Sequence, residues 1–375
     1  MTQIMMSTMT DPRIVEWTVD DEVVRLREWA SDRVHRLPPA APPEAMALGG
    51  WLLGSAEDCA FRLEDPSRRV SRHHARLLRE RSRWSLLDLG SKNGLRVDGT
   101  RQTTALLDPG IEIGIGGLTL IAESMRLIEL RSFLARLLGW NVDRAETIDL
   151  AMRAVRMAQA RRTPLVLRGE GDLVPLAHDL HRRVLGSERP FVLCDPRRQS
   201  IEANVRSSAN VDRGLEALAA ARGGSLCVRS SRPPADFIKV ISALRDPDSQ
   251  VQLIVCDAAP HDAEALLAVP ITIPPLATRR DELPHIIHEY TLDAAQAFGV
   301  PARFYSEDRE WILQHSARSL HEIEKGARRL TALRVAGSVL GAAELLGMAA
   351  VSLRRWIGRR AVPSLSADQL DLPPE

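Results

Sequence analysis

Residues Val70–Gly99 read VSRHHARLLRERSRWSLLDLGSKNGLRVDG, and this stretch decides the fold of the N-terminal part of the chain. Its two hydrophobic alternations are separated by polar turns, a pattern typical of an antiparallel sheet meander and not of a helix. The Asn93-Gly94 pair supplies residues that tolerate a positive φ in a tight turn. Two loops therefore leave the predicted strands; one carries Ser71 and Arg72, the other Ser91, Lys92 and Asn93.

These two loops offer hydroxyls, a guanidinium, an ammonium and a side-chain amide, which suit an extended anionic ligand. Each loop by itself is also what an ordinary hairpin turn would show. The combined spacing of short motifs closely resembles the forkhead-associated (FHA) domain, and the motifs are Gly54, Ser71-Arg72-x-His74, Trp84, Asp88-Leu89-Gly90-Ser91, Asn93-Gly94 and Gly99. The resemblance implies an all-β sandwich over residues 12–124 that binds a phosphothreonine-containing protein.

The resemblance also implies a role for each matching residue. Ser71 and Arg72 would contact the phosphate, Asn93 would hold the peptide backbone, and His74 would brace the loop from inside. Where the family usually has Gly-Arg, this chain has Gly54-Ser55, so one phosphate-contacting arginine is absent. The arginines that could compensate are Arg62, Arg68 and Arg69. The predicted phosphopeptide-binding residues are Ser55, Ser71, Arg72, Ser91, Lys92 and Asn93; the alternative is a folded interaction module that ignores phosphate.

Length and composition bound the remaining possibilities. At 375 residues the chain is long enough for two or three domains, and its net charge of +1 provides no global field toward nucleic acid or membrane. The four cysteines lack the spacing of metal ligands, so we expect buried thiols, no metal site and no disulfide. The chain has neither an apolar run of 18 residues nor the pattern of a signal peptide, so we expect a cytoplasmic protein without a membrane partner.

The middle of the chain changes character from strands to alternating strands and helices. Helical spacing predicts linker helices within residues 125–160, and apolar runs such as FVLC and LIVC then alternate with helical segments over residues 161–280. This alternation predicts a doubly wound parallel sheet, followed by an all-helical region over residues 281–335.

This middle region resembles the AAA+ domain of the NtrC-like enhancer-binding proteins, the activators of sigma-54 RNA polymerase. The most specific match is Ile273–Pro284, which reads IPPLATRRDELP. The resemblance implies an α/β domain with a helical lid, but its catalytic motifs are missing: the loop Gly169–Pro175 has no lysine for ATP phosphates, and Cys227–Ser230 replaces the acidic pair. The family's sigma-factor loop is absent as well. We therefore expect a pseudo-ATPase, not an enzyme, with no cofactor, whose sheet serves as a scaffold or as a surface for a homo-oligomer.

The last structured stretch, residues 336–360, predicts two short helices with a turn at Gly347. It resembles the Fis-type helix-turn-helix that closes the same family, and the resemblance implies DNA binding through Ser352, Arg354, Arg355 and Arg359. Nine arginines and lysines against three glutamates lie between Arg318 and Arg360, so positive charge is concentrated here. The alternative is an amphipathic helical hairpin with a solvated arginine face.

The predicted fold class is therefore multidomain: an FHA sandwich, a central α/β AAA+-like domain with a helical lid, and a helix-turn-helix. The expected boundaries are a disordered N-terminus (1–11), sandwich (12–124), linker helices (125–160), α/β domain (161–280), lid (281–335), helix-turn-helix (336–360) and a disordered tail (361–375). The pairs His178/His181 and His285/His288 are expected to be solvated helix residues. The leading hypothesis is a phosphothreonine-responsive transcriptional regulator; the alternative is an FHA adaptor in Ser/Thr-kinase signalling that does not bind DNA.

Overall fold

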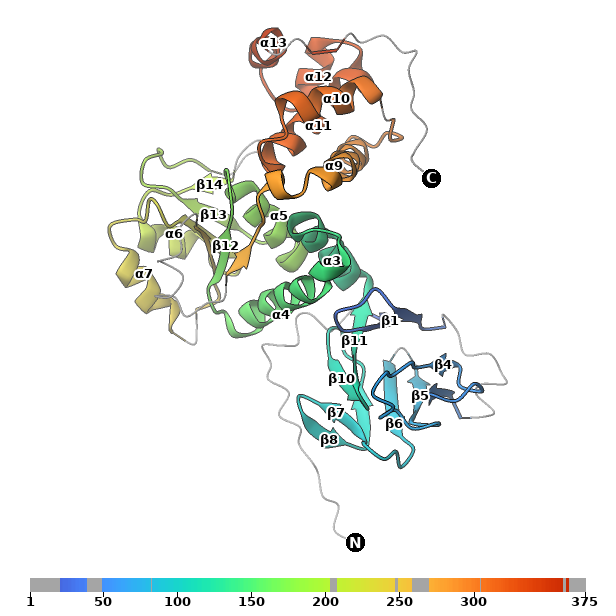
Figure 1. Ribbon diagram of the computed structural model, residues 1–375. Coiled ribbons are helices and arrows are strands. Elements are labelled where there is room, and N and C mark those ends of the chain that lie inside the picture. Colours follow the sequence, from blue (N-terminus) through green and yellow to red (C-terminus); the bar gives the residue numbers. More distant parts are fainter. Residues whose placement is uncertain are drawn as a thin grey trace. The chain divides into compact units, whose positions relative to one another are not determined.

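The chain folds into two compact units, which Figure 1 shows as a ribbon. Unit 1 comprises Met1–Ala135 and Asn141–Arg153, and unit 2 comprises Arg136–Trp140 and Ala154–Glu375. The computed structural model describes residues 21–38, 49–81, 83–202, 208–246, 249–257, 270–303, 305–359 and 362–363. The predicted disordered N-terminus and almost all of the predicted disordered tail lie outside these residues.

Unit 1 contains two sheets that share one core. The first sheet has the order β2-β1-β11-β10-β7-β8, and its strands are Val34–Arg36, Val23–Glu28, Leu118–Ser124, Glu112–Ile115, Leu95–Val97 and Thr100–Gln102. The second has the order β4-β3-β5-β6-β9, and its strands are Phe61–Arg62, Trp51–Gly54, Ala75–Glu80, Arg83–Asp88 and Thr104–Leu106. Side chains from both sheets, among them Leu26, Leu53 and Trp84, form the buried core, as alternating strands of a sandwich require. The predicted β-sandwich is confirmed.

The predicted meander is wrong at one step. β5 and β6 pair as antiparallel neighbours, but the next strand, β7, belongs to the other sheet and pairs with β10. Leu86 on β6 and Leu95 on β7 are both fully buried in the shared core. The alternation in the sequence fixes which face of a strand is buried, but not which strand is its partner, so both arrangements satisfy the same pattern.

A 3₁₀ turn joins two helices after the sandwich. The helices are α3 (Met125–Leu138) and α4 (Ala145–Arg161), and the turn between them is η1 (Val142–Arg144). Within unit 1, the buried Arg27 donates from Nε to Glu123 Oε1 at 2.8 Å and from Nη1 to Asp149 Oδ2 at 3.0 Å. The first turns of α4 are thus tied to the sandwich by a fully paired buried charge.

Unit 2 contains the expected parallel sheet. Its order is β14-β13-β15-β16-β12-β17, and every pairing in it is parallel. The strands are Ala209–Asn210, Phe191–Cys194, Ser225–Arg229, Gln252–Asp257, Leu165–Arg168 and Ile271–Thr272. In the described residues, the helices between them are α5 (Val174–Leu185), α6 (Gly214–Ala220) and α7 (Phe237–Leu244). All four residues of β13 are buried, as expected for a parallel strand covered on both faces.

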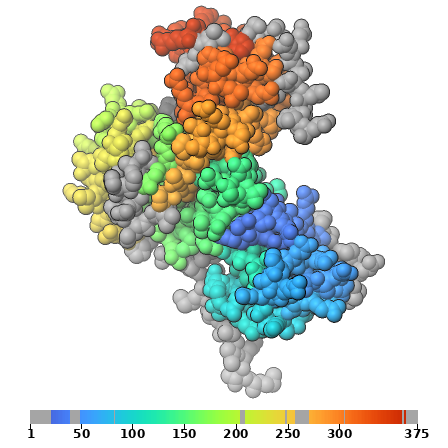
Figure 2. Space-filling view, in the orientation of Figure 1, coloured from blue at the N-terminus to red at the C-terminus, as the bar shows by residue number. Residues whose placement is uncertain are grey.

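The rest of unit 2 is helical (orange to red in Figures 1 and 2). Its elements are η2 (Leu276–Thr278), η3 (Arg280–Glu282), α9 (Leu283–Ala297), α10 (Ser306–His315), α11 (Leu320–Ala336), α12 (Val339–Leu345) and α13 (Ala350–Gly358). Ser319 caps α11 by accepting from Glu322 N, and Gly337 ends it with a φ of +60°. Arg279 donates to the carbonyls of Arg136 and Leu137, which are terminal acceptors of α3. Among the described residues, no helix combines the length and apolarity that crossing a membrane requires.

Candidate functional site

Asp65 organises the loop that leads to Ser71 in the sandwich. Its carboxylate accepts from the backbone N–H groups of Ser67 (2.9 Å), Arg69 (2.8 Å), Val70 (3.1 Å) and Gly117 (3.0 Å). Desolvation acts to raise the pKa of Asp65, but the hydrogen bond from Ser67 Oγ (2.6 Å) and those from the backbone outweigh it and lower the pKa to about 2. Asp65 was not among the predicted site residues, although the Asp-Pro-Ser turn pattern is a local signal for such a residue.

His74 braces from inside, as the resemblance implied, the two loops that carry Ser71-Arg72 and Ser91-Lys92-Asn93, which we call the recognition loops. Its Nδ1 accepts from Ser71 N at 3.0 Å, so the ring proton lies on Nε2, which faces Gly94 O at 3.2 Å and Ser91 Oγ at 3.0 Å. The side chain is fully buried, and desolvation lowers the pKa of the imidazole. His74 is therefore a neutral residue that joins the loop before β5 to the loop before β7.

Ser91 lies inside its loop, although we predicted it among the phosphopeptide-binding residues. Its hydroxyl donates to Asp88 Oδ1 at 2.5 Å and accepts from Gly94 N at 2.9 Å, and the residue is 5% exposed. Because its hydrogen-bonding capacity is used within the protein, Ser91 acts as a positioning residue.

Direct hydrogen bonds join the two loops at the surface. Lys92 N donates to Ser71 Oγ at 3.1 Å, and Asn93 Nδ2 donates to Arg69 O at 2.7 Å. Ser71 keeps its own hydroxyl proton in this arrangement, and the side chains of Arg72 and Lys92 are exposed. The structure thus brings Ser71, Arg72, Lys92 and Asn93 together on one surface with a donor-rich, cationic character.

Ser55 lies against the same loop through its backbone. Ser55 N donates to Ser71 O at 3.1 Å, and a Cβ at Gly54 would come within 2.1 Å of Arg72 O, so only glycine permits this approach. The proposed compensating residues Arg62, Arg68 and Arg69 are all exposed. A cation that the sequence analysis missed, Arg101 of β8, donates from Nη2 to Ser91 O at 3.2 Å.

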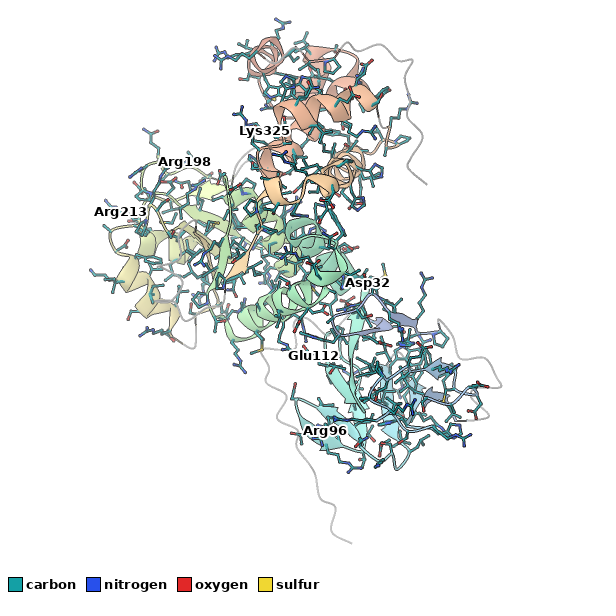
Figure 3. The ribbon with its side chains drawn as sticks, viewed as in Figure 1. Asp32, Arg96, Glu112, Arg198, Arg213 and Lys325 are labelled. Carbon is teal, nitrogen blue, oxygen red and sulfur yellow. The ribbon has the colours of Figure 1, made fainter. Side chains whose placement is uncertain are left out.

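A second charged site lies at the carboxyl edge of the parallel sheet in unit 2. Arg229, the last residue of β15, donates to Asp172 at 2.8 Å and to Asp195 at 3.0 Å. Desolvation opposes the charge on Asp172, but the Arg229 guanidinium outweighs it and lowers the pKa of that carboxyl. The side chain of Asp195 is fully buried, and its Oδ2 lies 3.6 Å from Nε of Arg198, which is labelled in Figure 3.

The predicted DNA-binding residues lie in α13 and at its C-terminal end. Ser352, Arg354, Arg355 and Arg359 are exposed, whereas Leu353 and Trp356 of α13 are buried. The Trp356 ring packs edge-on against the ring of Trp311 in α10, with 5.1 Å between the ring centroids. Gly347 has a φ of +60° in the turn between α12 and α13, as expected for the residue that permits this turn.

Of the four histidines expected to be solvated, His285 is exposed, His178 and His288 are half-buried, and His181 is buried. His181 is 2% exposed, with Nε2 3.0 Å from Arg189 O and Nδ1 2.8 Å from Ser225 Oγ. Desolvation lowers the pKa of His181 to about 4. The prediction of a solvated His181 is wrong, because the buried face of α5 covers the sheet.

Comparison with known proteins identifies the family of the sandwich. Residues 51–116 match the model of the FHA domain family, so this part of the chain is an FHA domain. No curated protein matched the chain. The match does not extend over the predicted α/β or C-terminal regions.

Several solved structures are similar over about a quarter of the chain. The FhaA FHA domain, complexed with the intracellular domain of another protein, is 28% identical over 26% of this chain and 96% of its own, with a TM-score of 0.22. Mycobacterium tuberculosis EmbR, in complex with a low-affinity phosphopeptide, is 25% identical over 26% of this chain and 24% of its own, with a TM-score of 0.22. The second FHA domain of a Mycobacterium tuberculosis ABC transporter is 34% identical over 24% of this chain and 76% of its own, with a TM-score of 0.18.

Proposed function

We propose that this chain is a phosphothreonine-responsive regulator whose FHA domain receives a phosphorylated protein and whose C-terminal helices bind DNA. The observation that carries the first part is the joined loop surface, where Lys92 N meets Ser71 Oγ and Asn93 meets Arg69 O beside the exposed Arg72. A phosphate ester needs several charge-assisted donors at once, and this surface offers them on a braced backbone.

A peptide-binding experiment tests the first part. Full-length protein is titrated against a degenerate peptide library synthesised in three forms, with phosphothreonine, phosphoserine or threonine at the fixed position. We expect selective retention of phosphothreonine peptides, with affinity that falls as salt rises. Equal retention of all three forms, by protein with an intact circular dichroism spectrum, would favour the phosphate-blind interaction module.

The arginine-bearing face of α13 supports the DNA-binding part. Leu353 and Trp356 fix the helix to its neighbours, which leaves Ser352, Arg354 and Arg355 exposed for phosphate and base contacts. Val351, at 64% exposed, adds an apolar side chain that suits a thymine methyl group.

A salt-dependent titration separates the regulator from the adaptor. Wild-type protein and the double variant Arg354→Ala/Arg355→Ala are titrated against fragmented DNA with nonspecific competitor at two salt concentrations. We expect salt-sensitive enrichment of a few fragments by the wild type and its loss in the double variant. If folded wild-type protein retains no fragment, the adaptor without DNA binding replaces the regulator.

The central domain is proposed to be an AAA+-like scaffold without ATPase activity. Arg229 lies where the resembling family carries its acidic pair, and it is paired with Asp172 of the loop that would hold phosphate. A Cβ at Gly171 would lie 2.9 Å from Ser319 Cβ, so the cap of α11 packs directly on this loop. We expect no ATP turnover above buffer in a phosphate-release assay; turnover that disappears on altering Gly169–Asp172 would refute the scaffold.

A further inference from the structure

Three side chains with different ligand atoms meet beside Arg72 in the FHA domain. Asp58 and Cys59 come from the segment after β3, and His73 comes from the loop before β5. His73 Nε2 lies 2.8 and 2.9 Å from the two oxygens of Asp58. One oxygen, one sulfur and one nitrogen atom of these residues all lie within 4.8 Å of one another.

The backbone holds the two contributing segments in place. Ser55 N donates to Ser71 O and Ala56 N donates to Arg72 O, each at 3.1 Å, while Cys59 N donates to Ala56 O at 3.2 Å. Because these bonds do not depend on the three side chains, the ligand atoms are assembled before any ion arrives.

The burial of the three residues fits an ion that enters from solvent. Asp58 and His73 are exposed, whereas Cys59 is 8% exposed and its thiol donates to Arg72 O at 3.2 Å. Since Ala56 N donates to the same carbonyl, Arg72 O stays satisfied when the thiol loses its proton to become a ligand. A sulfur, a nitrogen and a carboxylate oxygen are the ligand types that zinc combines, and three protein ligands leave one position open.

We propose that Asp58, Cys59 and His73 form a zinc site next to the phosphopeptide surface, with its fourth position open to solvent. Without metal, the Asp58 carboxylate is a source of negative charge beside Arg72. With zinc bound, the ion contributes two positive charges, Cys59 releases its proton to water, and the site becomes neutral. Zinc thereby balances the charge of the Asp58 carboxylate beside Arg72, at the edge of the surface where Ser55 stands in place of the family's arginine.

A cobalt titration tests the site without reference to peptides. Full-length protein is stripped with chelator and titrated with Co²⁺, whose bond to a thiolate gives a near-ultraviolet charge-transfer band. We expect one equivalent of Co²⁺ to produce the band and Zn²⁺ to remove it. Cys59→Ser should abolish the band and His73→Asn should weaken Co²⁺ binding at least tenfold, while Cys194→Ser, another buried cysteine, should change neither. No thiolate band in folded wild-type protein, or a band that persists in Cys59→Ser, would overturn the site.

The charge role rests on the proposed function and has its own readout. Affinity for a phosphothreonine peptide is measured with one equivalent of zinc and with chelator. We expect several-fold tighter binding with zinc in the wild type, and no effect of zinc in Cys59→Ser. Equal affinity in both conditions would refute the charge role. If cobalt binds as expected while no phosphopeptide binds in either condition, the proposed phosphothreonine recognition fails and the metal site stands.

Discussion

The recognition loops of the FHA domain and the carboxyl edge of the parallel sheet use charge in opposite ways. In the loops the carboxylate of Asp65 accepts hydrogen bonds from backbone N–H groups, and the side chains of Arg72 and Lys92 are exposed. At the sheet edge the cation Arg229 is held by two acids, Asp172 and Asp195. Acids that are satisfied by the backbone leave cations for a ligand, whereas cations that are satisfied by acids stabilise the fold. We therefore expect substitutions in the recognition loops to change ligand binding, and substitutions at the sheet edge to change the free energy of unfolding.

The largest effect should come from breaking the ion pairs of Arg229. Arg229→Ala leaves the fully buried Asp195 without its 3.0 Å ion pair. The remaining cations, Arg198 and Arg232, lie at 3.6 and 3.7 Å, and Arg197 N donates to Asp195 Oδ1 at 3.1 Å. Removing one partner of a buried pair strands the other charge, so the free energy of unfolding should fall by about 3 kcal/mol. Chemical denaturation followed by circular dichroism measures this. If the free energy of unfolding fell by less than about 0.5 kcal/mol, the ion pairs of the sheet edge would contribute no more to stability than the exposed charges of the loops do.

The pH dependence of stability should report the buried His181 in unit 2. Because its folded-state pKa of about 4 lies below the ordinary value of 6.5, the unfolded chain binds the proton more readily. The contribution is complete above pH 6.5 and is lost as pH falls toward 4, with a loss of about 2 kcal/mol already at pH 5. We expect the free energy of unfolding, measured by denaturation at several pH values, to depend less steeply on pH between 6.5 and 4 in His181→Gln than in the wild type. An unchanged slope would assign the dependence to other groups.

Arg72→Ala should weaken phosphothreonine-peptide binding by about 10- to 100-fold, because a charge-assisted hydrogen bond contributes roughly 1.5–3 kcal/mol. The free energy of unfolding should stay within about 0.5 kcal/mol of the wild type, since the side chain is exposed. The matched control is Arg83→Ala, an exposed arginine at the opposite end of β6 from the loops. Isothermal titration of both variants measures the difference. If Arg72→Ala and Arg83→Ala bound the peptide with equal affinity, Arg72 would not contact the phosphate.

The smallest effect should come from an exposed ion pair of the sandwich. Arg33 Nη1 lies 3.0 Å from Glu64 Oε2, with side chains 48% and 64% exposed. Arg33→Ala should change the free energy of unfolding by less than about 0.5 kcal/mol and should leave peptide affinity unchanged. Thermal denaturation and the same titration measure both quantities. A larger loss of stability would show that ion pairing contributes to stability even where the side chains are exposed, so burial would not explain the difference between the two regions.

Local patterns predicted much of the architecture and part of the site. Helical spacing from Met125 to Leu138 matches α3, and the apolar run FVLC matches a fully buried parallel strand. The motif spacing identified the FHA domain and the bracing role of His74. The same patterns did not predict that Ser91 is buried or that His181 faces the sheet, since both depend on which element covers which face.

The sequence by itself determined the strand alternation, the two polar loops and the absence of a lysine from Gly169–Pro175, because each is a property of neighbouring residues. Only the tertiary structure decided that β6 and β7 lie in different sheets and that Arg229 meets Asp172 and Asp195. It also brought Asp58 and Cys59 to His73, which is 14 positions away from Cys59 in the chain. These arrangements arise from packing and hydrogen bonding between distant segments, and a local pattern specifies the face that a residue occupies but not the partner that it meets there.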